Sequence, residues 1–282
     1  MKELTVKKRM AKDRLFHSLV LFFASLVVIP LLFLLGYIFK KGIAVINWDF
    51  IVSMPAGVGE SGGGIVHSLV GTLLLILIAV FLSVPVAVGA ALFINDHPKN
   101  RISQLIRFTV DMLQGIPSII MGIVIYIWIV LPMKNFSALA GGVALGIMML
   151  PIIIKSTEET LKMVPESLKE ASLALGAPYY KTVLRVILPA GLSGILTGIL
   201  LGVSRIAGET APLLFTAFGN PFLNTDLFKP VDALPLLIYN YSTSPYPEWI
   251  RIAWGASFIL VTFVLILNLI TRWVVKKWQI KF

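Results

Sequence analysis

Long apolar runs separated by short charged segments set the pattern of this chain. Each run reaches, or nearly reaches, the about 20 helical residues needed to cross a hydrocarbon core of ~30 Å. Apolar residues occupy consecutive positions rather than alternate ones, which favours helices over membrane-spanning strands. The runs are Leu15–Phe39, Ser61–Asn95, Met112–Met133, Asn135–Ile154, Val186–Ser204 and Ile252–Thr271.

This pattern predicts an all-α, polytopic membrane protein with six transmembrane helices in one domain, residues 1–282. The first span is expected to be retained, because its apolar stretch exceeds the about 7–15 residues of a signal peptide. On the fourth span, Gly142 and Gly146 at small-xxx-small spacing predict close helix contact. The expected spans are residues 16–39, 67–94, 108–131, 136–154, 187–214 and 252–274, with a long inner loop at 155–185.

Charged residues fall mainly at the ends of the apolar runs. The chain has 24 Lys and Arg, 14 Asp and Glu, and a formal net charge of +10. Of the basic residues, 18 lie in segments 1–15, 95–107, 155–185 and 272–282. Because basic residues concentrate on the cytoplasmic side of membrane proteins, we expect both termini in the cytoplasm and no nucleic-acid-binding face. Asp111, near the inner end of the third span, is expected to be solvated or capped.

Metal and thiol chemistry are not expected, because the chain has no Cys and three scattered His. One outer segment matches catalytic patterns by letter: Gly59, Ser61 and Gly63 fit a nucleophile elbow, and the same segment fits a dinucleotide fingerprint. Neither match has the strand that its pattern requires, so we interpret the segment as a flexible loop. An intramembrane hydrolase that uses Ser61 or His67 is the alternative.

The inner loop at 155–185 carries helix signals of its own. Pro165 suits the start of a helix, and Glu166 places a carboxylate in the first turn, where it favours the helix dipole. Gly176 suits a left-handed C-cap, and Pro178 can open a second short helix. A stripe of apolar and small residues is formed by Leu168, Ala171, Ser172 and Leu175. The stripe suits close approach by another protein, and a helix lying on the membrane surface is the alternative.

Glu170-Ala171-Ser172, Gly176 and Ile187-Leu188-Pro189 resemble the EAA loop of ABC importer permease subunits. The family pattern has Ala at the third position, where this chain has Ser172. The resemblance implies a type I ABC importer permease fold, with a cytoplasmic coupling helix that docks on a separate ATPase subunit. The chain has no Gly-Lys pair and hence no P-loop, so ATP and Mg²⁺ are expected on the partner ATPase. We expect neither enzymatic activity nor a cofactor on this chain itself.

Two charges and a row of glycines share one face of the predicted fifth span. A charge inside the bilayer costs about 2.5–3.5 kcal/mol, so it is expected to face protein or a water-filled route. Tight helix packing by the glycines and a structural ion pair are the alternatives to a solute path. At 100° per residue, the positions are about 0° for Gly194, 40° for Gly198, 80° for Gly202, 20° for Arg205 and 60° for Glu209.

The run from Arg205 to Thr216, Arg-Ile-Ala-Gly-Glu-Thr-Ala-Pro-Leu-Leu-Phe-Thr, resembles the signature of PstA-type permease subunits of phosphate importers. The segment Gly115-Ile116-Pro117-Ser118 also fits this subgroup. The resemblance implies a phosphate path along Arg205, Glu209 and Thr210 and the glycine face. Arg offers a planar fork that matches two phosphate oxygens, and Glu209 can accept a hydrogen bond from a protonated phosphate.

The implied assembly contains a second, related permease chain, a dimer of ATPase subunits and an extracytoplasmic phosphate-binding protein, in the cytoplasmic (inner) membrane of a prokaryote. Movement of the coupling helix is expected to switch access to the path between the two sides of the membrane. A permease for sulfate, molybdate or another oxyanion is the nearest alternative, and a passive anion channel is a further one.

Overall fold

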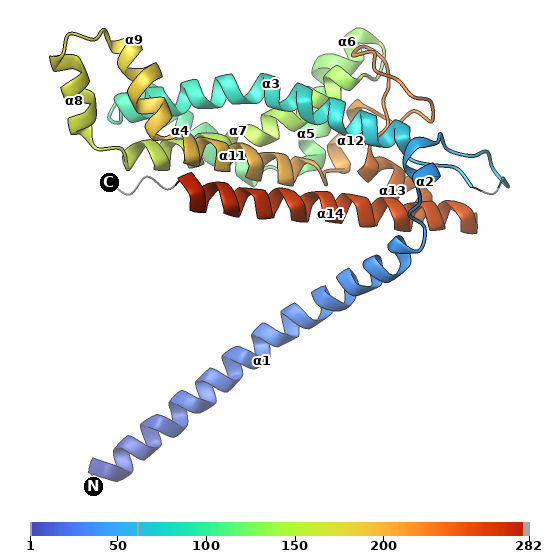
Figure 1. Ribbon diagram of the computed structural model, residues 1–282, viewed down its shortest axis with the longest axis horizontal. Helices are drawn as coiled ribbons and strands as arrows, with labels where there is room; N and C mark the ends of the chain where they lie inside the picture. Colours follow the sequence, from blue (N-terminus) through green and yellow to red (C-terminus); the bar gives the residue numbers. More distant parts are fainter. Residues whose placement is uncertain (1, 61, 279–282) are drawn as a thin grey trace.

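The computed structural model describes residues 2–60 and 62–278, and within them the chain is almost entirely helical (Figure 1). The β-pairing seen among these residues is an isolated bridge between Phe218 and Val231. The helices, of which η1 and η2 are π-helical, are α1 (Lys2–Ile43), α2 (Trp48–Val52), α3 (Val66–Asp96), α4 (Arg101–Gly115), α5 (Ser118–Ile125), η1 (Tyr126–Val130), α6 (Leu131–Met133), α7 (Ala138–Lys162), α8 (Glu166–Ala174), α9 (Tyr179–Thr182), η2 (Val183–Ile187), α10 (Leu188–Ala190), α11 (Leu192–Ile206), α12 (Ala211–Thr216), α13 (Leu234–Ser242) and α14 (Pro247–Trp278).

Four of the described helices, α1, α3, α7 and α14, are each long and apolar enough to cross a membrane. Two further candidates are bent pairs. The chain bends by 108° between 101–115 and 118–133, and by 68° between 179–190 and 192–206. If each bent pair is one span, the number of spans is six. The predicted all-α, polytopic fold is confirmed, but two of its spans are interrupted.

Helices α3 and α7 form the centre of the bundle. A methyl group on Gly142 of α7 would lie 2.6 Å from Ile78 Cβ of α3, and one on Gly146 would lie 3.3 Å from the Ala79 carbonyl oxygen. Leu145, between these glycines, is buried. The close helix contact predicted from the small-xxx-small spacing is confirmed, because the backbones approach where side chains are absent.

The predicted third span, residues 108–131, is not one helix. Helix α4 ends at Gly115, and Ile116 adopts an extended conformation with φ −76° and ψ 126°. Pro117 explains the break, because it has no N–H for a helical hydrogen bond and disfavours helical dihedrals in the residue before it. The apolar segment therefore starts at Ser118, and α4 is a separate helix.

Charged side chains fasten α4 to α7. The guanidinium of Arg107 donates two hydrogen bonds, of 3.0 and 2.8 Å, to one carboxylate oxygen of Glu158, which also lies 2.7 Å from Lys162 Nζ. The Glu158 side chain is nearly buried. Asp111 is largely solvent-exposed and pairs with Lys155 at 2.7 Å, so the expectation that Asp111 is solvated is confirmed.

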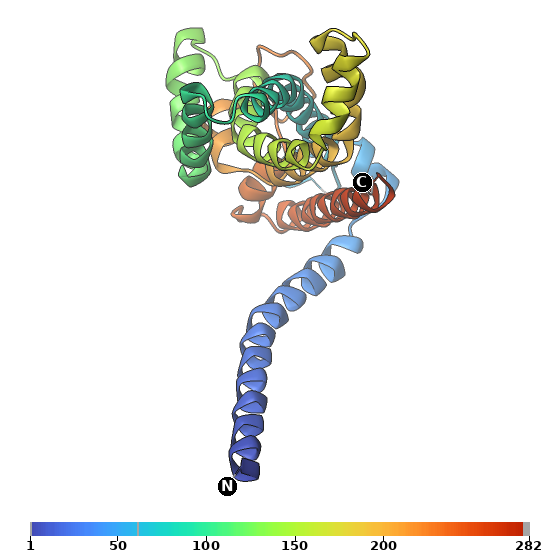
Figure 2. The same cartoon turned by 90° about the vertical axis from the view of Figure 1, so that its left-hand side faces the viewer.

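Helix α1 extends away from the bundle (Figures 1 and 2). It touches α14 near its own C-terminal end, where the ring of Tyr37 meets Trp254 at 5.1 Å between centroids and Phe39 meets Phe258 at 4.9 Å. A methyl group on Gly42 would lie 2.8 Å from the Trp254 carbonyl oxygen. No part of the most apolar stretch of α1 is buried within this chain.

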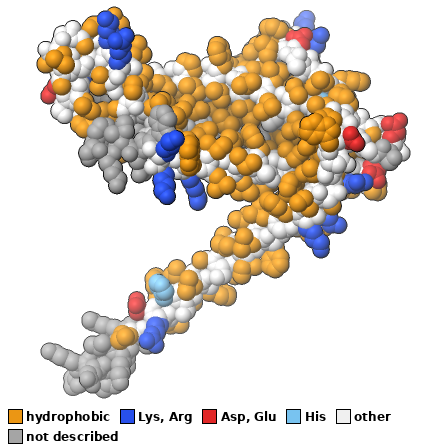
Figure 3. All heavy atoms as spheres, viewed as in Figure 1, with side chains coloured by type: hydrophobic (Ala, Val, Ile, Leu, Met, Phe, Trp, Pro, Cys, Tyr) orange, Lys and Arg blue, Asp and Glu red, His pale blue; other side chains and the backbone are white. Residues whose placement is uncertain are grey.

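The two ends of the bundle carry different parts of the chain. Helices α8 and α9 and the last turns of α14 lie at one end, and α2, α6 and the segment 219–233 lie at the other (Figure 1). The first turns of α1 point toward the α8 end. Apolar side chains cover the visible face between the ends, and charged side chains gather at the ends (Figure 3). This distribution suits a protein whose middle meets lipid.

Candidate translocation and coupling sites

The glycine stripe of α11 is a packing face. A methyl group on any of its three glycines would come within 3.0 Å or less of a side chain on α7. Ser156 Oγ also donates a hydrogen bond of 3.0 Å to the Gly194 carbonyl oxygen. The pairs are Gly194 with Thr160, Gly198 with Ser156, and Gly202 with Met149. In this structure α7 covers these glycines, as in the tight helix packing given above as the alternative to a solute path.

The fifth span is interrupted before the second of its charges. Helix α11 ends at Ile206, residues 207–210 form a turn, and α12 begins at Ala211. Pro212 has no N–H to donate to the carbonyl four residues earlier, which favours a break in the helix at this point. The prediction of one helix over residues 187–214 is therefore wrong. The angular position calculated at 100° per residue therefore holds for Arg205, which lies on α11. It does not hold for Glu209, which lies in the turn.

Arg205 and Glu209 form a loose ion pair beside this turn. Arg205 Nε lies 3.7 Å from Glu209 Oε1, and the two side chains are 45% and 19% exposed. A tight structural pair would instead bring guanidinium nitrogens to about 2.7–2.9 Å from the carboxylate. Within the described residues the Arg205 guanidinium makes no hydrogen bond, so its two terminal nitrogens are available to another molecule.

Thr210 completes a short polar segment. Its carbonyl oxygen accepts the backbone N–H groups of Leu213 and Leu214 at 3.1 and 3.2 Å, and its side chain is half-buried. The following helix is held firmly, since a methyl group on Gly122 of α5 would lie 2.7 Å from Pro212 Cα. A guanidinium, a carboxylate and a hydroxyl therefore lie within six residues, at the junction of α11 with α12.

The predicted coupling helix is present as α8. It begins at Glu166, with Pro165 at its N-cap, and Gly176 takes the left-handed conformation with φ +80°. None of its residues is buried, and Glu170 and Ala171 are exposed. The two apolar members of its predicted stripe, Leu168 and Leu175, are 36% and 88% exposed. In this chain α8 therefore presents an exposed surface.

Ser172 has a contact that Ala could not make. Its Oγ lies 2.9 Å from Thr182 Oγ1 on α9, and Thr182 is fully buried. This hydrogen bond joins the two short helices of segment 155–185. The departure from the Glu-Ala-Ala pattern thus stabilises the hairpin that α8 and α9 form.

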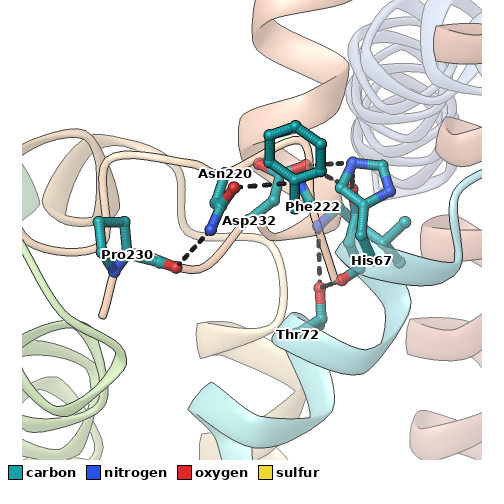
Figure 4. A network of polar contacts seen from close by, with 8 residues as sticks. His67, Thr72, Asn220, Phe222, Pro230 and Asp232 are labelled. Carbon is teal, nitrogen blue, oxygen red and sulfur yellow. Dashed lines mark hydrogen bonds and ion pairs between the residues drawn. The ribbon is translucent and has the colours of Figure 1, made fainter. Parts of the chain in front are cut away.

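The hydrolase alternative has the wrong geometry at His67. This side chain is buried in a polar network at the start of α3 (Figure 4). Ser68 Oγ and Asp232 Oδ2 both contact the same ring nitrogen, Nε2, at 3.1 and 3.2 Å, and Nδ1 has no partner among the described residues. A catalytic triad needs the carboxylate on the opposite nitrogen from the hydroxyl. Ser61 lies outside the described residues.

The His67 network instead clamps segment 219–233 onto α3. Ser68 Oγ donates to Asp232 Oδ2, and Thr72 Oγ1 accepts the backbone N–H of Leu234 at 2.8 Å. A methyl group on Gly71 would overlap the Asp232 carbonyl oxygen. This clamp has no local sequence signal, because its partners are more than 160 residues apart. The Arg107–Glu158 contact between α4 and α7, whose partners are 51 residues apart, also has no local sequence signal.

Comparison with known proteins agrees with this arrangement. Residues 83–280 match the family model described as "Binding-protein-dependent transport system inner membrane component". The chain belongs to this family. A chain of the MetNI methionine ABC transporter, crystallised in an inward-facing conformation, matches with a TM-score of 0.59 and 21% identity, over 77% of this chain and 95% of that one. A second crystal form of MetNI matches with a TM-score of 0.55. These matches confirm the type I ABC importer permease fold.

Relatives within the family share much more sequence. A protein of Yersinia pestis named "Phosphate transport system permease protein PstA" is 40% identical over 233 residues, which is 82% of this chain and 79% of the relative. The PstA of Haemophilus influenzae is 38% identical over 87% of this chain and 88% of the relative. "Phosphate transport system permease protein PstA 1" of Mycobacterium tuberculosis is 38% identical over 88% and 84%. The resemblance to PstA-type permeases is confirmed along most of the chain.

Proposed function

We propose that this chain is the membrane permease subunit of an ATP-driven phosphate importer and forms half of its translocation path. The observation that carries the proposal is the 40% identity, over more than four-fifths of the chain, to a relative named as a phosphate transport permease. The exposed, loosely paired guanidinium of Arg205 supports it, because an anion carrier needs a cation that its own carboxylates do not fully occupy.

The proposed assembly pairs this chain with a second, related permease and with two ATPase subunits. The exposed surface of α8 supports an ATPase partner, which would bind ATP and Mg²⁺, and the uncovered apolar face of α1 supports a membrane-embedded partner. A phosphate-binding protein would deliver the anion at the end that holds α2 and segment 219–233. Basic residues near α8 and at both chain ends favour a cytoplasmic location for these parts, in the inner membrane of a prokaryote.

Anion recognition is assigned to the junction of α11 and α12. The planar fork of Arg205 can bind two phosphate oxygens, and the helix break leaves its terminal nitrogens free. Glu209 can accept a hydrogen bond from a phosphate that carries a proton, and sulfate carries none at neutral pH. Thr210 can donate or accept through its hydroxyl. Selection of phosphate over sulfate therefore depends on Glu209.

Uptake of labelled anions in a strain without its own phosphate importer tests the proposal. Arg205→Lys is expected to abolish most uptake, since a point charge does not reproduce the fork. Glu209→Gln is expected to reduce the preference for phosphate over sulfate. Arg14→Lys, at an exposed position on α1 away from the junction of α11 and α12, is the control and should transport normally.

The outcomes separate the alternatives. Uptake of sulfate or molybdate in place of phosphate by the wild-type assembly would assign the chain to another oxyanion. Normal phosphate uptake by Arg205→Lys would make the pair structural. Deletion of Glu166–Gly176 should stop ATP-dependent uptake, whereas a passive channel would still conduct. Unchanged conduction after this deletion would overturn the importer.

A further inference from the structure

A cluster of three side chains ties the coupling helix to the transmembrane bundle. Asp96 is the last residue of α3, and its side chain is 14% exposed. Its carboxylate accepts a hydrogen bond of 2.8 Å from Lys169 Nζ on α8 and another from the hydroxyl of Tyr179 on α9. The Lys169 ammonium also lies 5.3 Å from the centre of the Tyr179 ring. One carboxylate thus holds both helices of the hairpin.

The hairpin is otherwise weakly attached through α8. Within the described residues, Lys169–Asp96 is the one side-chain hydrogen bond or ion pair that joins α8 to an element outside the inner loop. A pocket of about 640 Å³ lies where α8 meets the ends of α3 and α7, and its lining includes Glu166, Asn95 and Leu161. Apolar packing across such a pocket cannot transmit a small displacement, because the contact atoms are missing. A charged contact that bridges the pocket can.

The receiving helix is well placed to move the rest of the bundle. Helix α3 packs against α7 along the Gly142 and Gly146 seam, where the two backbones nearly touch. At its other end α3 carries His67, whose contact with Asp232 clamps segment 219–233 onto the helix. A force on Asp96 therefore acts on α3, a rigid helix that reaches from the coupling hairpin to the opposite end of the bundle.

We propose that Asp96 is a positioning residue for transport, which passes movement of the ATPase-docked hairpin to α3 through Lys169 and Tyr179. The inference rests on the proposed function, since it assumes an ATPase that moves α8. It differs from a static role, in which Asp96 would hold the hairpin in place for docking and have no effect after the ATPase has bound.

The test measures both ATP hydrolysis and uptake of labelled phosphate in proteoliposomes that hold the complete assembly. The readout is phosphate transported per ATP hydrolysed. Asp96→Asn is expected to lower this ratio about fivefold or more, the lower end of typical coupling between distant sites, while the ATPase still assembles. Tyr179→Phe keeps the ring beside Lys169 and is expected to have a smaller effect. Asp13→Asn, at an exposed position on α1 far from the hairpin, is the control and should leave the ratio unchanged.

Exchanging the charges of Asp96 and Lys169 tests whether the contact between them matters, rather than either side chain alone. Asp96→Lys and Lys169→Asp are each expected to uncouple transport from hydrolysis, and the double variant is expected to restore most of the ratio. An unchanged ratio in assembled Asp96→Asn complexes would overturn the inference, as would a double variant no better than the single ones. If the wild-type assembly hydrolyses ATP without phosphate uptake, the proposed function fails instead.

Discussion

The glycine face of α11 leads to a graded prediction. Replacing each glycine with Ala places a methyl group at a different distance from α7: 2.6 Å from Thr160 Cβ at Gly194, 2.8 Å from Ser156 Cβ at Gly198, and 3.0 Å from a side-chain terminus at Gly202. The neighbour at Gly202 is the end of a flexible Met side chain and can move aside. We therefore expect the loss of stability on replacement with Ala to be largest at Gly194, smaller at Gly198 and smallest at Gly202.

The magnitude follows from two opposing effects. Forcing a methyl group into filled space costs about 1–3 kcal/mol. Replacing Gly with Ala within a helix contributes about 0.5–1 kcal/mol in the other direction. Gly89→Ala on α3 isolates the second effect, because nothing lies within 4 Å of the added methyl group. Gly194→Ala should therefore be about 1–3 kcal/mol less stable than Gly89→Ala.

Thermal unfolding of the purified assembly in detergent provides the assay. At about 2–4 °C per kcal/mol for a large domain, the two variants should differ by about 2–12 °C in apparent Tm. Adding Thr160→Ala to Gly194→Ala removes two of the crowded atoms and should recover part of the loss. Equal Tm values for Gly194→Ala and Gly89→Ala, together with a loss of uptake in Gly194→Ala alone, would refute the packing role and return the stripe to the solute path.

Substitutions at three other positions test two tertiary contacts and the cap of α8. Arg107→Ala should lower stability by about 1.5–3 kcal/mol, because the nearly buried Glu158 loses two charge-assisted hydrogen bonds, and Arg107→Lys should recover part of it in thermal unfolding. Gly71→Ala should lower Tm and increase proteolysis of segment 219–233, because the methyl group would overlap the Asp232 carbonyl oxygen; undiminished Tm would contradict the clamp. Gly176→Ala should weaken ATPase binding in a pull-down, because a left-handed residue with a side chain costs about 1–2 kcal/mol, whereas Gly176→Asn should bind more nearly as wild type.

The sequence predicts the helices of this fold better than their interruptions. Apolar runs of membrane length identify the spans, and Pro165 and Gly176 mark the two ends of α8. The breaks at Pro117 and Pro212 carry a signal in the missing N–H of proline. That signal is ambiguous, because α7 continues through Pro151 without ending.

The candidate site shows a different limit. A helical wheel correctly places Gly194, Gly198 and Gly202 on one face, but it does not say whether that face meets a helix or a solute. That answer depends on α7, whose position follows from tertiary packing. The wheel also assumes an unbroken helix, so it misplaces Glu209. Contacts such as Asp96 with Lys169, 73 residues apart, have no periodic pattern that could identify them.

Because α1 contacts the rest of the described chain only through its final turns, its membrane insertion can be separated from the folding of the bundle. Helix α1 is long and apolar and contacts the remainder of the chain at one end. It can therefore enter the bilayer before the bundle forms. Within this chain, hydrophobicity and length constrain its sequence more than contacts with the bundle do, and a membrane-embedded partner would add contacts of its own. Apolar substitutions within this stretch are therefore expected to leave the contacts among the other described helices unchanged.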